Sequence, residues 1–191
     1  KVMLRTTANE LIVEDGKVTG VKATQYDGTE VTMHATKGVI LATGGYAANI
    51  EMVQETNTYW DKDFIADNIG TTNRSSLTGD GITMAVAAGA ATEGEGWTQM
   101  MGWVDNGNLS GGAGENVIFI NAATGKRYVD ESAERDVLSE GGFENGMSKE
   151  TAEKLGLKYV PGIYVEVSNT NVVAGMGGFN NTKADVPGRM Y

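Results

Sequence analysis

Strand-like alternation of apolar and polar residues runs through the first part of the chain, in the stretch "NELIVEDGKVTGVKATQYDGTEVTMHA". Two Asp-Gly pairs, Asp15-Gly16 and Asp27-Gly28, separate three runs that are rich in β-branched residues. An Asp-Gly pair between such runs is typical of the tight turn of a β-hairpin. The pattern therefore predicts a three-stranded antiparallel meander.

An unbroken apolar run, residues 38–42, follows the meander and ends in Thr43-Gly44-Gly45. Continuous apolar character predicts a strand that is buried on both faces, as in a layered α/β sheet. Glycines at the carboxyl end of such a strand either form a tight turn or let a ligand approach the backbone closely. This motif by itself favours the turn.

Helical periodicity begins after Asn49. The stretch "NIEMVQETN" predicts a short helix, and "TGDGITMAVAAGA" predicts a longer one with Thr78 or Asp80 as its N-cap. Gly89 should end that helix. Its apolar side should consist of Ile82, Met84, Ala85 and Ala88.

The second half of the chain mixes loops, strands and one further helix. A glycine-rich loop with two tryptophans covers "WTQMMGWVDNGNLSGGAGEN", and "NVIFINAATGKRYVDES" predicts a hairpin that turns at residues 123–125. The stretch "SAERDVLSEGGFENG" predicts a helix that begins at Ser132, and strand patterning returns from "GIYVEVSN" onward. Strands at both ends with mixed elements between them predict an α+β fold, with a middle segment inserted between two parts of one sheet domain.

Composition argues against several classes of function. The 191 residues carry a net charge of −10 with a pI of about 4.6, which disfavours nucleic acid as a partner because phosphate binding needs clustered Lys and Arg. Cysteine is absent and His34 is the only histidine, so we expect no metal site and no Ser-His-Asp triad. No window approaches the ~20 apolar residues that a membrane-spanning helix needs. The composition does not identify a cellular compartment.

Glycine and charge clusters mark the candidate chemistry. Asp80 in "TGDG" opens a helix, where it either caps the helix or accepts hydrogen bonds from a ligand. The charged stretch "GKRYVDESAERDVLS" is typical of a solvated, salt-bridged face, although an arginine there can also clamp a carboxylate. A last cluster, "GMGGF", follows a strand pattern at residues 175–179. The order of these motifs is more informative than any one of them.

The order "KGVILATGGYAAN", "TGDGITMAVAAGA", "GKRYVDESAERDVLS" and "GMGG" resembles the flavoprotein subunits of fumarate reductase and succinate dehydrogenase, with the related soluble fumarate and urocanate reductases. The resemblance covers nearly the whole chain. It implies part of an α/β FAD-binding domain with an inserted α+β capping domain. On this basis residues 1–52 belong to the FAD-binding domain, 53–160 form the capping domain, and 161–191 return to the FAD-binding domain.

The same resemblance implies contacts with the cofactor. Thr43, Gly44 and Gly45 match the backbone segment that lies near the FAD, and Asp80 matches an FAD-contacting Asp at the boundary of the cap. No GxGxxG fingerprint is present, so the strand–turn–helix that holds the FAD pyrophosphate is expected outside this chain. The chain thus looks like a fragment that cannot hold FAD tightly, and we expect it to be inactive by itself.

Arg135 matches the family's arginine that gives a proton to the substrate while flavin N5 gives a hydride to the adjacent carbon. An arginine is an unusual general acid because its guanidinium holds the proton tightly. The role therefore needs a neighbouring proton relay, for which Glu131, Glu134 and Asp136 are the candidates.

The substrate pocket departs from the family pattern. Met101 stands where the family has a substrate-binding histidine, while the glutamine two positions earlier is retained as Gln99. The family's "HHTMGG" segment becomes "VAGMGG", which keeps Gly177 and Gly178 but has neither histidine. With Trp103 and other apolar residues around it, the pocket suits an apolar or aromatic substrate better than fumarate.

The leading hypothesis is a fragment of an FAD-dependent oxidoreductase that acts on the activated C=C bond of a small molecule other than fumarate. Its electron donor would be a haem or FMN domain, fused or separate, outside this segment. One alternative is a non-catalytic binding or interaction module derived from the capping domain, since the substrate histidines and the pyrophosphate site are both missing. Another is a flavoenzyme of the ketosteroid dehydrogenase type, which the "RD" helix disfavours.

Overall fold

The computed structural model describes residues 1–71, 73–100, 104–105, 108–109 and 117–168. The chain divides into two compact units. Unit 1 consists of Lys1–Thr56 with Arg74–Gly96, and unit 2 consists of Asn57–Asn73 with Trp97–Tyr191. Each unit is therefore built from two separate stretches of the sequence.

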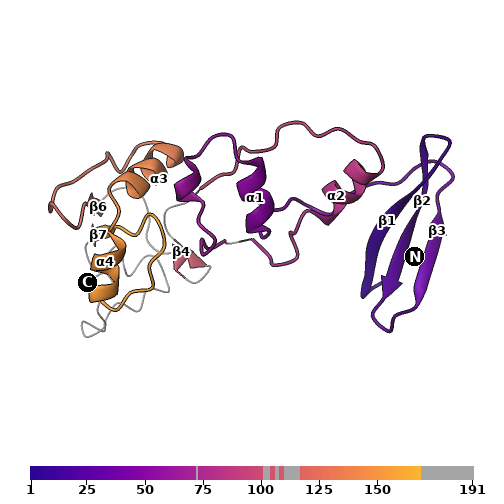
Figure 1. Ribbon diagram of the computed structural model, residues 1–191, viewed down its shortest axis with the longest axis horizontal. Coiled ribbons are helices and arrows are strands. Elements are labelled where there is room, and N and C mark those ends of the chain that lie inside the picture. The colour runs from indigo at the N-terminus through magenta and orange to yellow at the C-terminus, as the bar shows by residue number, and fades with distance from the viewer. Residues whose placement is uncertain (72, 101–103, 106–107, 110–116, 169–191) are drawn as a thin grey trace. The chain divides into compact units, whose positions relative to one another are not determined.

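Unit 1 contains the predicted three-stranded antiparallel meander, which the structure confirms. Its strands lie in the order β1-β2-β3, with β2 in the middle (Figure 1). The strand bounds are β1 Thr6–Glu14, β2 Lys17–Gln25 and β3 Glu30–His34. Leu11 lies opposite Val21, two residues before Ala23, so the buried side chains of Leu11 and Ala23 share one face of the sheet. This face holds the core of the meander.

Both Asp-Gly pairs form the turns that the sequence predicts. Asp15 and Gly16 have φ values of 50° and 73°, the left-handed backbone that a two-residue hairpin turn requires. In the second turn the Asp27 carboxylate accepts the backbone N–H of Thr29 at 2.9 Å. Local turn chemistry therefore determines the connections of the meander.

The apolar run at residues 38–42 does not form the predicted buried strand. It has no regular secondary structure, and none of the strands in the described part of the chain pairs with it. Ile40 is 93% exposed. The prediction is wrong because a strand needs a neighbouring strand to satisfy its backbone N–H and C=O groups. An apolar sequence does not by itself provide that partner strand.

The two helices of unit 1 form where the periodicity predicts them, as α1 Ile50–Thr56 and α2 Asp80–Ala87. The side-chain oxygen of Asn49 accepts the N–H of Met52 at 3.1 Å at the start of α1. The predicted apolar side of α2 is buried or half-buried, and Gly89 follows the helix with a left-handed φ of 94°.

The predicted N-cap of α2 is wrong. Gly79 occupies that position with a φ of 87°, and no side chain caps the helix there. Thr78 and Asp80 interact with each other instead, since the Thr78 hydroxyl donates to an Asp80 carboxylate oxygen at 2.9 Å. The two alternative candidates for the N-cap are thus hydrogen-bonded to each other.

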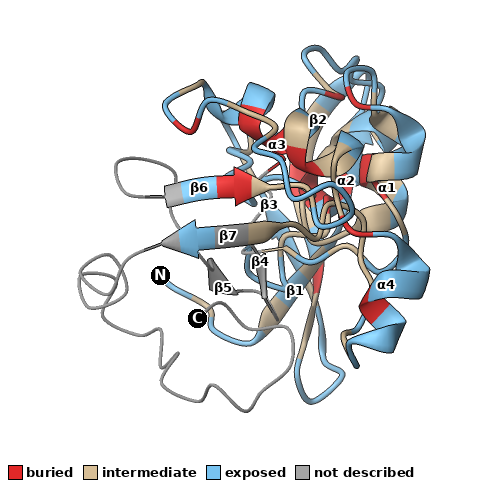
Figure 2. Ribbon diagram, turned by 90° about the vertical axis from the view of Figure 1, so that its left-hand side faces the viewer, coloured by how far each residue is buried: buried red, intermediate tan, exposed pale blue. Residues whose placement is uncertain are grey.

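The longest strands of unit 2 come from distant parts of the sequence. β6 (Val117–Ile120) pairs antiparallel with β7 (Val165–Ser168), and the two lie side by side in Figure 2. The shorter elements of this unit are η1 Lys62–Phe64, β4 Val104–Asp105 and β5 Asn108–Leu109. β7 confirms the strand pattern expected near the C-terminal end of the described residues.

The predicted hairpin after β6 is confirmed at its turn and in a short pairing beyond it, in which the N–H of Tyr128 donates to the carbonyl of Phe119 at 3.3 Å. The carbonyl of Asn121 accepts the N–H of Gly125 at 2.9 Å, and Gly125 has a φ of 66°. The returning chain makes an isolated bridge between Ile120 and Arg127 rather than a strand. The Phe119 N–H donates to a buried side chain instead of to a returning strand, which explains the short pairing.

The third predicted helix is α3 (Arg135–Glu144), which begins later than expected. Its N-cap residue is Glu134 and not Ser132. The backbone N–H and the hydroxyl of Ser132 both donate to one oxygen of Asp130, at 3.0 and 2.8 Å, so Ser132 closes the turn before the helix. A further short helix, α4 (Lys149–Lys154), was not predicted from the sequence.

The core of unit 2 lies between β6, β7 and α3. Phe119 of β6 is fully buried and packs with Leu138 of α3, which is 4% exposed. The partly buried side chains around them are Tyr128, Val129, Ala133 and Tyr164. All strand pairs among the described residues are antiparallel, so the predicted α+β class is confirmed. Within the same residues, no helix has the length and apolar character needed to cross a lipid bilayer.

Candidate functional site

The two glycine-containing motifs of unit 1, residues 43–45 and 78–81, lie close together in space. The segment after the first motif is tied to the segment before α2 by hydrogen bonds. The N–H of Ala48 donates to the carbonyl of Leu77 at 2.9 Å, and the side chain of Asn49 donates to the carbonyl of Thr78 at 3.1 Å. We call this contact the glycine junction.

The glycines of this junction allow the backbones to approach closely. A Cβ atom at Gly81 would lie 1.9 Å from the hydroxyl oxygen of Thr43, and one at Gly44 would lie 2.6 Å from a methyl group of Leu77. Gly44 also has a φ of 78°, which other residues rarely adopt. The glycines are therefore required by contact between parts of the protein, whether or not a ligand is bound.

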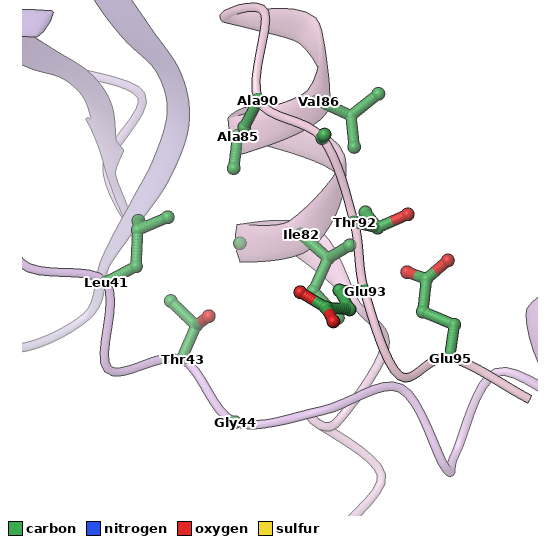
Figure 3. A pocket seen from close by; sticks show the side chains of 12 residues that line it. Leu41, Thr43, Gly44, Ile82, Ala85, Val86, Ala90, Thr92, Glu93 and Glu95 are labelled. Atoms are coloured by element: carbon green, nitrogen blue, oxygen red, sulfur yellow. The ribbon is translucent and has the colours of Figure 1, made fainter. Parts of the chain in front are cut away.

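An open cleft of about 350 Å³ borders the glycine junction. Figure 3 shows Thr43 and Gly44 on one side of it and the side chains of α2, among them Ile82 and Val86, on the other. The acidic side chains of Glu93 and Glu95 also line it. The remaining lining residues are Leu41, Gly81, Ala85, Ala90, Ala91 and Thr92.

Two of the four predicted cofactor residues do not line this cleft. Gly45 is exposed, with open space where a Cβ would lie, and Asp80 is exposed at the first position of α2. Thr43 and Gly44 do line it. Contact of all four residues with FAD stays a prediction.

Unit 2 holds the predicted proton donor. Arg135 is the first residue of α3 and is exposed. One of its three relay candidates, Glu131, is engaged elsewhere: it is 5% exposed, accepts the Phe119 N–H at 2.8 Å, and pairs with the guanidinium of Arg127 through two hydrogen bonds. We call this group the Glu131 anchor. It connects β6 to the turn that precedes α3.

The electrostatics of the Glu131 anchor favour an ionised carboxylate. Burial would raise the pKa of Glu131, but the hydrogen bonds from Arg127 and from the Phe119 N–H outweigh burial and lower this pKa below its ordinary value. A carboxylate held in this way is a poor proton relay. Glu134 and Asp136, which are exposed next to Arg135, are better placed for that role.

An aromatic side chain that was not predicted contacts the first turn of α3. The Tyr59 hydroxyl donates to a carboxylate oxygen of Asp136 at 3.4 Å. Partial burial and the negative charge of Asp136 raise the pKa of Tyr59 above its ordinary value. A lone tyrosine in a polar connection gives no sequence signal for such a role.

The predicted substrate residues are only partly within the described chain. Gln99 is exposed in unit 2. Met101, Trp103, Gly177 and Gly178 lie outside the described residues. Over the described part of the chain, no group of three or more acidic, histidine or cysteine side chains is arranged to hold a metal ion.

Comparison with known families decides the classification. Residues 1–181 match the family described as "FAD binding domain". This chain belongs to that FAD-binding family. FAD is therefore the cofactor that the classification indicates, and the flavoprotein resemblance seen in the motifs is confirmed.

Individual relatives agree with this classification. The chain is 47% identical over 151 residues to the NADH:acrylate oxidoreductase of Vibrio harveyi, covering 76% of this chain and 15% of that protein. It is 33% identical over 149 residues to the urocanate reductase of Eggerthella lenta, covering 73% of this chain and 23% of that protein. The chain thus spans less than a quarter of either relative's length.

A solved structure shows the same fold. The open conformation of a flavocytochrome c3 fumarate reductase superposes with a TM-score of 0.57 and 26% sequence identity, covering 73% of this chain and 24% of that structure. The FAD-binding family, the mixed α+β fold and this structural similarity agree with one another.

The chemistry of the unit 1 cleft fits part of FAD. Its volume of about 350 Å³ is near the lower end of the ~300–1,000 Å³ typical of small-molecule pockets. The carboxylates of Glu93 and Glu95 would repel a phosphate but can accept hydrogen bonds from hydroxyl groups. The cleft therefore suits an uncharged part of the cofactor and does not suit its pyrophosphate.

Proposed function

We propose that this chain is part of an FAD-dependent oxidoreductase that reduces the activated C=C bond of an enoate other than fumarate. The observation that carries the proposal is the 47% identity to a protein named NADH:acrylate oxidoreductase over 76% of the chain. Acrylate has one carboxylate, which agrees with a pocket in which Met101 stands at the position of a family histidine that binds a dicarboxylate.

The cofactor side of the proposal concerns unit 1. Thr43 and Gly44 border FAD in the cleft, Gly45 continues that backbone segment, and Asp80 accepts hydrogen bonds from FAD at the start of α2. Support comes from the cleft beside the first two residues and from the family classification. The family resemblance separately assigns residues 1–52 and 161–191 to the FAD-binding domain and 53–160 to the capping domain, so that α2, which belongs to compact unit 1, falls within the capping range.

The substrate side concerns unit 2. FAD held beside Thr43, Gly44 and Asp80 would, when reduced, supply a hydride to one carbon of the substrate C=C bond. Arg135 gives a proton to the neighbouring carbon, so that the π bond is replaced by two C–H bonds and FAD is left oxidised. Glu134 or Asp136 returns a proton to Arg135, because Glu131 is held in its own anchor. Gln99 donates a hydrogen bond to an oxygen of the substrate.

The electron donor is proposed to be NADH acting through a separate redox group. The relative from Vibrio harveyi carries NADH in its name, and the structural neighbour is named a flavocytochrome. A haem or FMN domain outside this segment would carry electrons between NADH and FAD. The proposal assigns this chain to the half of the reaction in which the substrate is reduced.

The test uses the full-length protein that contains this chain, purified with FAD and reduced chemically in the absence of oxygen. Adding acrylate should restore the visible absorbance of oxidised flavin, and fumarate should restore it far more slowly. Arg135→Gln should lower the rate about 10²- to 10⁴-fold, as expected for loss of a general acid. The absorbance of the bound flavin should be unchanged in this variant.

Arg5→Gln provides a matched control, because Arg5 is also exposed but lies over the ring of Tyr26 in unit 1. It should retain the wild-type rate. A protein that purifies without flavin would contradict the proposal and favour a binding module. Fumarate reduction as fast as acrylate reduction would contradict the assigned substrate, and an unchanged rate in Arg135→Gln would contradict the assigned acid.

A further inference from the structure

The chain passes between the two compact units at three points. It leaves unit 1 after Thr56, re-enters it at Arg74 and leaves it again after Gly96. Within unit 1, one short segment, residues 46–49, is hydrogen-bonded to the chain at or near each of these points. This segment directly follows Gly45, the last residue of the first glycine motif. We call residues 46–49 the crossing clasp.

A single side chain of the clasp holds both exits from unit 1. The hydroxyl groups of Tyr46 and Thr56 are hydrogen-bonded to each other at 3.0 Å, and the N–H of Gly96 donates to the Tyr46 hydroxyl oxygen at 3.3 Å. Gly96 is buried and has a left-handed φ of 88°. A buried N–H group is costly without a partner, and the Tyr46 oxygen supplies one. The last residue of each stretch of unit 1 is thus bonded to the same hydroxyl group.

The re-entry point is held by the other end of the clasp. The N–H of Ala48 donates to the carbonyl of Leu77, and the side chain of Asn49 donates to the carbonyl of Thr78. Leu77 in turn donates its N–H to the carbonyl of Arg74 at 3.0 Å, which closes the turn that begins at the re-entry point. All three crossings are therefore tied to one short segment of unit 1.

The clasp also contacts both motifs that are proposed to border FAD. Tyr46 follows Gly45 in the sequence, and a Cβ atom at Gly79 would lie only 2.9 Å from the Cβ of Tyr46. Gly79 is the N-cap residue of α2 and directly precedes Asp80. The backbone assigned to the cofactor is thereby packed against the residue whose hydroxyl holds the two exits.

We propose that Tyr46 is a positioning residue that links the cofactor-bordering backbone of unit 1 to the connections leading into unit 2. This inference rests on the proposed function, in which the substrate receives a hydride from the cofactor held by unit 1 and a proton from Arg135 of unit 2. The two donors belong to different units, so their alignment depends on how firmly the connections are held. Loss of the Tyr46 hydroxyl loosens both exits and lowers turnover, because misaligned groups react slowly.

Limited proteolysis of the full-length, FAD-loaded protein tests the clasp directly. A glutamate-specific protease can cut after Glu55 and Glu95, which directly precede the two exit residues. Tyr46→Phe should raise both cleavage rates about fivefold, the change in opened chain expected for loss of a hydrogen bond. Tryptic cleavage after Arg74 should be unchanged, because the hydroxyl does not hold the re-entry point. Tyr26→Phe, at a tyrosine of unit 1 that is 84% exposed, is the matched control and should change none of these rates.

Kinetics separate a positioning role from a purely structural one. Tyr46→Phe should lower kcat for acrylate about tenfold or more, a loss that small misplacements far from the chemistry can cause, with KM and the flavin absorbance unchanged. A wild-type kcat in a variant whose exits are cut faster would overturn the positioning role.

Two cleavage results would also overturn the proposal. They are unchanged cleavage at both exits and faster cleavage at every site, the second of which indicates general destabilisation. Absence of acrylate turnover in the wild-type protein would instead overturn the proposed reaction. Faster cleavage confined to the two exits of Tyr46→Phe would then still support the link through Tyr46.

Discussion

The glycine junction of unit 1 and the Glu131 anchor of unit 2 solve the same structural problem by opposite means. Each holds an irregular loop against the start of a helix, α2 in one case and α3 in the other. The junction removes side chains, so that Thr43 and Leu77 approach Gly81 and Gly44 directly. The anchor inserts a charged side chain, Glu131, and surrounds it with donors.

The difference shows that a motif's residue types do not reveal its physical role by themselves. Two glycines at Gly44 and Gly45 suggest room for a ligand, yet Gly44 is needed for contact with Leu77. A run of charges from Lys126 to Asp136 suggests a solvated face, yet it contains the buried carboxylate of Glu131. In unit 1 the contact that explains Gly44 comes from Leu77, which is far away in the sequence. In unit 2 the contact that explains Glu131 comes from Phe119, which lies on the other side of a turn.

The largest expected effect comes from removing the anchor. Glu131→Ala leaves the Phe119 N–H without its partner and should lower the free energy of unfolding by about 3 kcal/mol, the upper end for a hydrogen bond to a charged group. Urea unfolding of the full-length protein, followed through a probe in unit 2, measures it. Glu153→Ala, at an exposed carboxylate in α4, is the control and should lie within about 0.5 kcal/mol of wild type. Equal stability of the two variants would show that the anchor contributes nothing.

Overfilling the glycine junction should have the next largest effect. Gly81→Ala places a Cβ against the Thr43 side chain and should cost about 1–3 kcal/mol, as overpacking usually does. The same urea experiment applies, with a probe in unit 1. Gly45→Ala is the matched control because its Cβ would meet open space. Adding Thr43→Ala to Gly81→Ala should recover part of the loss, and no recovery would place the strain elsewhere.

Acid should weaken the anchor without any mutation. The pKa of Glu131 is lower in the folded protein than the ordinary value of about 4.3. Its contribution to stability is therefore complete above that ordinary value and is lost as the pH falls through the folded-state pKa. The stability difference between wild type and Glu131→Gln should shrink from neutral pH to below pH ~4. A difference that is constant across this range would contradict the ionised anchor.

The smallest effect is expected for an ion pair on the meander. Lys22 donates to both carboxylate oxygens of Glu10 at 3.0 Å, and both side chains are more than half exposed. Glu10→Gln should change the free energy of unfolding by less than about 1 kcal/mol, because exposed pairs contribute little. The Glu→Gln substitution is thus made at an exposed carboxylate here and at the buried Glu131 in the acid experiment. A loss of stability as large as that of Glu131→Ala would show that burial does not set the strength of these two carboxylate contacts.

Elements governed by local chemistry were predictable from the sequence. The Asp-Gly turns at residues 15–16 and 27–28 and the apolar side of α2 are set by neighbouring residues, and the structure confirms them. The strand expected at residues 38–42 depended on a partner strand that local sequence does not reveal. α4 was missed because its six residues, "KETAEK", carry almost no apolar periodicity.

In the candidate site, residues that belong to a motif were predictable from the sequence, and residues positioned only by tertiary contacts were not. The motif order led to the FAD-binding family, and Thr43 and Gly44 line a cleft. Tyr59, Trp60 and Ser139 carried no motif, because their roles arise from tertiary contacts with residues 97–100 and with α3. Packing of this kind becomes visible only when the chain is folded.

The pairing of β6 with β7 has a consequence for how the protein folds. The meander joins strands that are neighbours in sequence, whereas β6 must wait for Val165–Ser168 with α3 and α4 between them. Non-local strand pairing requires a costly loop closure and slows folding. During synthesis, unit 1's meander should therefore form early, while the core around Phe119 stays incomplete until β7 leaves the ribosome. That interval is when chaperones and proteases have access to the apolar centre of unit 2.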